Sequence, residues 1–226
     1  MLGMPKIVDT HTHICDSSFD ADRGEVLDRA ADAGVAAVIA VGENIADARR
    51  NIELADKHPM IYPAAGLYPT ILDLDQAEQM RSFIRSERLK LVAIGEVGLD
   101  FWVVKEEPQK EIQKEILKGF INLARELDLP LNIHSRSAGR HAVALLLECG
   151  PTRVQMHAFD GKASAALPAK ATFGLRSDRK KLLVTGPNLF GSLELEIWIL
   201  FVICYLVLGI LIFKDAIIFR YAFRLF

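Results

Sequence analysis

Apolar and polar positions follow two alternating patterns over residues 1 to about 163, and these patterns predict strands and helices in turn. Short apolar runs, such as 35–41 and 91–95, suit strands that are buried on both faces of a parallel sheet. Between the runs, apolar residues recur every three or four positions, as they do on the buried face of a helix. The longest such stripe begins at Pro108 and continues to Leu127.

The expected elements alternate regularly along the chain, with short connections between them. We expect strands near residues 7–8, 35–41, 61–67, 91–95, 130–133 and 153–156. We expect helices near residues 26–31, 45–55, 77–84, 108–127 and 137–150. Repeated strand–helix units of this kind predict an α/β fold with parallel strands.

Polar residues with metal-binding side chains stand where the predicted strands end. His11 and His13 follow the first strand, and Glu96, His134 and His157 follow the fourth, fifth and sixth. In a (β/α)8 barrel these strand ends converge on the face that carries the active site. The competing architecture is an open doubly wound sheet, but no glycine-rich nucleotide-binding motif follows the first strand. The positions of the polar residues therefore favour a TIM-barrel-like fold.

Four imidazoles and one carboxylate are ligands that divalent transition metals use. Imidazole favours Zn²⁺, whereas a carboxylate also admits Mg²⁺ or Mn²⁺. Side chains alternate along a strand, so His11 and His13 point in the same direction. Taken singly, each residue has an ordinary structural explanation, such as a hydrogen-bonded loop histidine. Together they predict a site for two divalent metal cations, with Glu96 as catalytic bridge between the ions.

Three aspartates near these positions are candidates for supporting roles. Asp9 is placed to accept the second N–H of a ligand histidine, or is a satisfied carboxylate at a strand end. Asp100 and Asp160 lie just past two ligand positions, where each is a candidate to touch metal, substrate or a ligand.

Two further features suggest contacts with a nucleic acid. Arg136 follows His134 by two positions, and its guanidinium would suit a substrate phosphate; the alternative is an arginine on a solvated loop. The aromatic pair Phe101-Trp102 follows the fourth strand. It either stacks on a base or packs under a loop.

Four motifs in order resemble those of the TatD-related DNases. They are Val-Asp-Thr-His-Thr-His (8–13), Ile-Gly-Glu-Val-Gly-Leu-Asp-Phe (94–101), Leu-Asn-Ile-His-Ser-Arg (131–136) and His-Ala-Phe-Asp-Gly (157–161). The run at 132–140 is similar to the animal TatD domain-containing 3 branch of that family. The resemblance covers residues 5 to about 163.

The resemblance implies a TIM-barrel metal-dependent hydrolase with deoxyribonuclease activity of 3′-to-5′ exonuclease character. DNA is then the substrate and two divalent ions are the cofactors. The resemblance implies that the metal ligands of this chain are His11, His13, Glu96, His134 and His157.

The same pattern requires two more strands and a final aspartate in a Glu-Thr-Asp-Ser-Pro-like motif. No such motif follows Gly161, and only 182–187 has the composition of a further strand. We therefore expect a C-terminally incomplete barrel of about six strand–helix units, with activity reduced or lost. The expected division is a partial barrel at 1–163, an irregular linker at 164–196 and a hydrophobic tail at 197–226.

The tail contains an uncharged stretch at 197–213, which is near the lower length limit of a membrane span. Lys214, Arg220 and Arg224 follow it. We expect a single hydrophobic helix unrelated to the barrel, as in an alternative transcript end. The other interpretation is membrane association through 197–213.

Composition narrows the functional classes. The net charge of −2 gives no global basic field, so a nuclease function must depend on a local site. Cys15, Cys149 and Cys204 are far apart and there is no secretory signal pattern, which fits the nucleus or cytoplasm. The alternatives to a DNase are an amidohydrolase-type hydrolase of amides or esters and a non-catalytic membrane-associated fragment.

Overall fold

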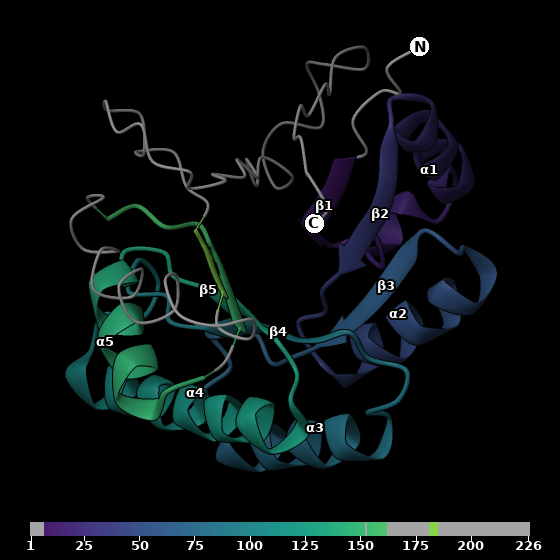
Figure 1. The fold of residues 1–226 in the computed structure, drawn as a ribbon. Helices are drawn as coiled ribbons and strands as arrows, with labels where there is room; N and C mark the ends of the chain where they lie inside the picture. The colour runs from purple at the N-terminus through teal and green to yellow at the C-terminus, as the bar shows by residue number, and fades with distance from the viewer. Residues whose placement is uncertain (1–6, 152, 162–180, 185–226) are drawn as a thin grey trace.

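The computed structural model describes residues 7–151, 153–161 and 181–184, which form a curved parallel sheet with helices along its outer side (Figure 1). The strands follow one another in chain order, from β1 to β7, and all neighbours pair in parallel. A doubly wound sheet reverses its strand order at a switch point, and this sheet does not. The predicted barrel-type arrangement is therefore confirmed for the described residues.

The elements alternate as the hydrophobic pattern predicts. The strands are β1 (Ile7–Thr12), β2 (Val35–Ala40), β3 (Ile61–Ala65), β4 (Ala93–Gly98), β5 (Leu131–His134), β6 (Arg153–His157) and β7 (Lys181–Val184). The helices are α1 (Arg23–Asp32), α2 (Ile45–Lys57), α3 (Leu74–Ser86), α4 (Glu107–Leu127) and α5 (Gly139–Cys149), with a 3₁₀ turn at Ser17–Phe19.

Local chemistry sets several helix ends. Asn44 caps α2 by accepting a hydrogen bond from the amide of Asp47, and Asp73 caps α3 by accepting from the amides of Asp75 and Gln76. Such caps satisfy amide groups that have no partner inside the helix. At the other end of α5, Gly150 adopts the left-handed conformation with φ of +65°, which stops the helix where the sequence predicts.

Apolar and polar side chains alternate along β5 and β6, so that the hydrophobic core and a cluster of polar side chains lie on opposite faces of the sheet. Leu131 and Ile133 of β5 belong to the main hydrophobic cluster, as does Met156 of β6. The intervening residues Asn132 and His134 of β5 have their buried polar side chains in the cluster described below. Period-two patterning therefore directs the apolar side chains to the helices and the polar ones to the other face of the sheet.

The fourth strand lies later in the chain than the pattern predicts. We expected 91–95 with Glu96 after the strand end, whereas β4 runs from Ala93 to Gly98 and contains Glu96. The amides of Lys90 and Leu91 instead donate to the preceding turn, at the carbonyls of Glu87 and Arg88. The ladder also continues beyond Glu96, because Gly98 pairs with His134 of β5.

A seventh strand lies within the expected linker at 164–196, of which only 181–184 belong to the described residues. Lys181–Val184 forms β7 and pairs in parallel with β6, from Arg153 opposite Lys181 to Met156 opposite Val184. The apolar character of 182–187 indicated this strand.

The hydrophobic tail at 197–226 lies outside the described residues. Within the described ranges, no helix has the length and hydropathy needed to cross a membrane.

Candidate metal centre

The carboxylate of Glu96, within β4, lies among four imidazoles, and each of its oxygens faces two of them. Oε1 accepts hydrogen bonds from Nδ1 of His134, at 2.5 Å, and from Nε2 of His157. Oε2 lies 3.3 Å from Nε2 of His13 and 3.8 Å from Nε2 of His11. The structure thus brings together all five residues that the sequence singles out as metal ligands.

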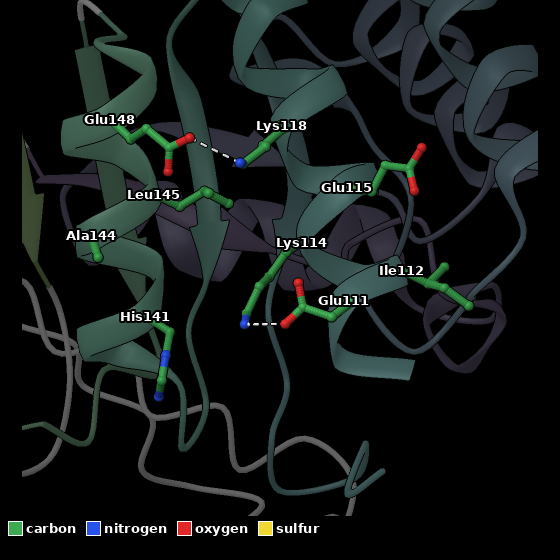
Figure 2. A pocket seen from close by; sticks show the side chains of 9 residues that line it. All are labelled: Glu111, Ile112, Lys114, Glu115, Lys118, His141, Ala144, Leu145 and Glu148. Atoms are coloured by element: carbon green, nitrogen blue, oxygen red, sulfur yellow. Dashed lines mark hydrogen bonds and ion pairs between the residues drawn. The ribbon is translucent and has the colours of Figure 1, made fainter. Parts of the chain in front are cut away.

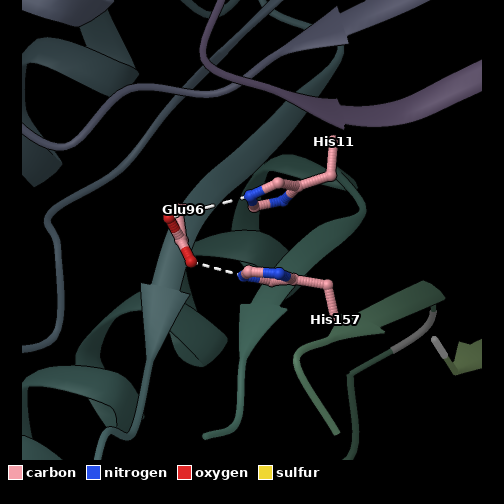
Figure 3. A group of neighbouring side chains, drawn as sticks. All are labelled: His11, Glu96 and His157. Atoms are coloured by element: carbon pink, nitrogen blue, oxygen red, sulfur yellow. Dashed lines mark hydrogen bonds and ion pairs between the residues drawn. The ribbon is translucent and has the colours of Figure 1, made fainter. Parts of the chain in front are cut away.

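The imidazoles come from distant parts of the chain. Figure 3 shows His11, from β1, and His157, from the end of β6, with their rings side by side and both directed at Glu96. The two rings are stacked, with centroids 3.6 Å apart and planes inclined by 26°. The candidate ligand atoms of His11, Glu96 and His157 all lie within 4.8 Å of one another. Parallel strands that end at the same edge of the sheet produce this convergence.

The charges in the cluster follow from burial and mutual contact. Burial alone would raise the pKa of the Glu96 carboxyl, but His157, His11, His13 and His134 hold that pKa well below its usual value. Burial would lower the pKa of His134, but hydrogen bonds to Asp100 and Glu96 raise it to about 9. Glu96 is therefore ionised beside a protonated His134, which would release a proton on binding a metal ion.

His11 and His157 have the opposite tendency. Burial, together with the neighbouring histidine charges, holds the pKa of both imidazoles below the usual value. Both rings are therefore neutral near neutral pH. The neutral imidazole is the form that binds a metal ion.

Asn132, on β5, determines which nitrogen of His11 is available. Its Nδ2 donates to the carbonyl of Thr10 at 2.7 Å, so its Oδ1 is the atom that faces Nδ1 of His11, at 2.9 Å. Nδ1 of His11 therefore carries the proton, and Nε2 keeps its lone pair. The sequence pattern did not single out Asn132; its signal was an amide two positions before His134, on the same strand face.

The chemistry of these atoms fits a cation. Nε2 of His11 and Oε2 of Glu96 are buried lone-pair atoms without a hydrogen-bond partner among the described residues. They face each other at 3.8 Å. A buried polar atom left without a partner costs about 1–3 kcal/mol. A divalent ion between them would satisfy both, since ligand bonds to zinc are about 2.0–2.2 Å long.

Asp100 contacts a candidate ligand, as the sequence suggested. Its side chain is fully buried, and Oδ2 accepts a hydrogen bond from Nε2 of His134 at 3.0 Å. Burial raises the pKa of the Asp100 carboxyl, but hydrogen bonds from His134 and Val103 and the charge of Arg136 bring it below its usual value. The ionised carboxylate orients the His134 ring, as outer carboxylates do for metal-binding histidines.

Asp9 has the second of the two roles considered for it, a satisfied carboxylate at a strand end, and Asp160 contacts the loop after β5. Asp9 accepts from the backbone amide of His11, at 3.0 Å, and not from an imidazole, because Asn132 occupies that position. Burial raises the pKa of Asp9 to about 6. Asp160 accepts from the amide and hydroxyl of Ser137, in the loop after β5.

Arg136 lies on the exposed loop after β5, with its guanidinium carbon 5.2 Å from the centre of the Trp102 ring. The two aromatic residues after β4 differ in their environment. Phe101 packs partly buried against the main core, whereas Trp102 is exposed.

Glu43 is a further acidic residue of this region that the sequence analysis missed. It follows β2 by three positions, and it interacts electrostatically with His13 and Glu96. Burial and the charge of Glu96 raise the pKa of its carboxyl. The rule that identified the other residues, a polar side chain just past a buried strand, applies to Glu43 as well.

A cavity lies elsewhere, on the outer surface between α4 and α5. Its volume is about 530 Å³, and Figure 2 shows Lys114 paired with Glu111 and Lys118 paired with Glu148 along it. These charges neutralise one another in solvent. We place the functional site at Glu96, because there the polar side chains are buried and converge.

Comparison with known proteins identifies the family of this chain. The family model described as TatD related DNase matches residues 8–175. The human deoxyribonuclease TATDN3 is 38% identical over 176 residues, which cover 71% of this chain and 63% of the human protein. The uncharacterized metal-dependent hydrolase YabD of Bacillus subtilis is 36% identical over 165 residues, which cover 71% of this chain and 63% of YabD.

A solved structure has the same fold. The crystal structure of YJJV, a TatD homolog from Escherichia coli K12, matches with a TM-score of 0.69 and 28% sequence identity, covering 79% of this chain and 67% of that one. The chain spans 59–64% of the length of three vertebrate relatives that it matches. The matched segment contains all the residues of the Glu96 cluster, and this chain belongs to the TatD-related DNase family.

Proposed function

We propose that this chain is a metal-dependent deoxyribonuclease that hydrolyses phosphodiester bonds. One observation carries the proposal: each oxygen of the buried Glu96 carboxylate faces two imidazoles, His134 and His157 on one side and His11 and His13 on the other. This arrangement suits two divalent cations, Zn²⁺, Mg²⁺ or Mn²⁺, bridged by Glu96.

A divalent ion in such a centre supplies an activated water and polarises a phosphoryl oxygen. The surrounding residues position the ligands. Asn132 holds His11 with its Nε2 lone pair directed at the site, and Asp100 orients His134. Arg136 is exposed near the cluster, and we assign its guanidinium to a substrate phosphate.

The experiment that tests this function is a hydrolysis assay on DNA oligonucleotides with Zn²⁺, Mg²⁺ or Mn²⁺, compared with EDTA. We expect metal-dependent cleavage by the full chain, slower than that of a relative with the complete barrel, and a further loss of at least about 100-fold in Glu96→Gln, which keeps the shape but removes the charge. Cleavage that persists in EDTA or in Glu96→Gln would refute the proposal. Amide and ester substrates in the same assay test the amidohydrolase alternative, for which they would be hydrolysed in preference to DNA.

We further propose a 3′-to-5′ exonuclease direction, with DNA as the partner molecule. An oligonucleotide labelled at its 5′ end should then give a ladder of products that shortens with time. Blocking the 3′ end should stop the reaction. Early release of the labelled 5′ nucleotide would contradict this direction.

We propose the nucleus or cytoplasm as the site of action, in keeping with three separated cysteines and no disulfide framework. Fractionation tests this location. If the chain stayed with the membrane fraction after carbonate extraction, anchoring through 197–213 would be favoured instead.

A further inference from the structure

Trp102 lies in the loop that joins β4 to α4, two residues after Asp100. The exposed fraction of the residue is 58% for Trp102 and 54% for Val103. The loop thus places two adjacent large hydrophobic side chains in solvent beside the Glu96 cluster. Folding alone does not explain this exposure, since an indole is favourably buried, and exposed apolar groups at a site frequently contact a ligand.

The position of Trp102 is tied to the cluster by a single carboxylate. Oδ1 of Asp100 accepts hydrogen bonds from the amides of Trp102, at 2.9 Å, and Val103, at 3.0 Å. Its other oxygen accepts from His134 at 3.0 Å. The Asp100 carboxylate therefore supports both the loop that carries the indole and the ring of His134, a candidate metal ligand.

Two cations flank the indole. The guanidinium carbon of Arg136 and Nζ of Lys105 each lie 5.2 Å from the centre of the Trp102 ring, within cation–π range. The amide of Phe101 donates to the carbonyl of Arg136, which joins the loops after β4 and β5.

Neither cation has a carboxylate at ion-pair distance within the part of the chain that the structure describes. Both side chains are exposed. Lys105 donates only to a neutral group, the carbonyl of Phe101, at 3.2 Å. An exposed indole beside two solvent-exposed cations matches the two parts of a nucleotide, a planar base and an anionic phosphate.

We infer that Trp102 is a stacking platform for an unpaired base of the DNA strand, and that Arg136 and Lys105 hold the adjoining phosphates. The inference rests on the proposed function and adds the side chain that contacts a base. Because every base has a π face, the contact adds little sequence preference.

The test measures binding with the full chain in EDTA, where metal-dependent hydrolysis does not occur. The chain has two tryptophans, so Trp198→Phe leaves Trp102 as the only indole. The probes are a short oligothymidylate and an abasic chain with the same number of phosphates. We expect the oligothymidylate to quench Trp102 fluorescence and the abasic chain to leave it unchanged.

Trp102→Ala should weaken binding of the oligothymidylate by about 10-fold, while Trp102→Phe should stay within about 3-fold of the parent. Affinity for the abasic chain should be unchanged in both variants, measured by anisotropy of labelled DNA. Arg136→Ala is the matched control, because a phosphate contact should weaken binding of both probes equally.

The inference would be overturned if Trp102→Ala bound both probes more weakly by the same factor, or bound both as tightly as the parent. Unchanged fluorescence on binding of oligothymidylate would overturn it as well. Because cleavage is measured separately with metal present, failure of this binding test leaves the hydrolysis assay unaffected. Absence of cleavage would refute the proposed function without removing base-dependent binding.

Discussion

Asn132 holds His11 in a single tautomer. The Asn132 amide donates to the carbonyl of Thr10, and its oxygen accepts from Nδ1 of His11 at 2.9 Å. The lone pair of His11 Nε2 therefore points towards Glu96, at 3.8 Å from Oε2. A neutral amide thus prepares a ligand for a cation, a role that the outer residues of metal sites commonly have.

Asn132→Ala should weaken binding of a divalent metal by about 10–100-fold, because His11 loses the partner that fixes its proton and its orientation. Competition with a fluorescent chelator measures the affinity. Asn51→Ala is the matched control, because Asn51 is buried in α2 and its amide has no hydrogen-bond partner among the described residues. Equal affinity of the Asn132 variant and the parent would show that the tautomer is set in another way.

Most residues of this site could be predicted from the sequence, because the carboxyl ends of parallel strands meet at the same edge of the sheet. The alternation in Leu131-Asn132-Ile133-His134 predicts a core face and a site face for β5. The pattern missed the role of Asn132 because that role depends on His11, a residue 121 positions away. The hydrophobic pattern placed β4 too early in the chain, because the residues before and after Glu96 are equally apolar. Burial alone therefore does not locate the strand end.

Gly98→Ala should destabilise the fold and weaken metal binding together. A methyl group at this position would overlap the carbonyl oxygen of His134, so β5 and its ligand would have to shift. We expect the free energy of unfolding to fall by about 1–3 kcal/mol, measured by denaturant titration.

Gly24→Ala provides the matched glycine control. No atom lies within 4 Å of the added methyl group, and the position is in α1. The free energy of unfolding should rise by about 0.5 kcal/mol, because alanine loses less conformational entropy in a helix. If both glycine variants changed stability alike, close packing at Gly98 would not be the cause.

The cap of α3 should contribute a pH-dependent part of the stability. Hydrogen bonds from the backbone amide and the side chain of Gln76 and from the backbone amide of Asp75 lower the pKa of the Asp73 carboxyl. A carboxyl with a lowered folded-state pKa stabilises the fold above its unfolded-state pKa, and this contribution is lost as the pH falls through the folded-state value. Asp73→Ala should therefore lower the melting temperature at neutral pH.

Asp73→Asn should keep the melting temperature near that of the parent at neutral pH, because asparagine caps helices about as well as aspartate. The difference between the parent and Asp73→Ala should shrink on acidification, as followed by thermal melts across the acidic range. A difference that is the same at neutral and acidic pH would mean that the charge of Asp73 does not contribute.

The most direct test of the central claim is the metal content of the purified chain and of Glu96→Gln, by inductively coupled plasma mass spectrometry. The carboxylate that faces four imidazoles should make the parent retain divalent metal, approaching two equivalents per chain when loaded. The variant should lose most of it while remaining folded by circular dichroism. No bound metal in the parent, or equal metal in both proteins, would contradict a metal centre built around Glu96.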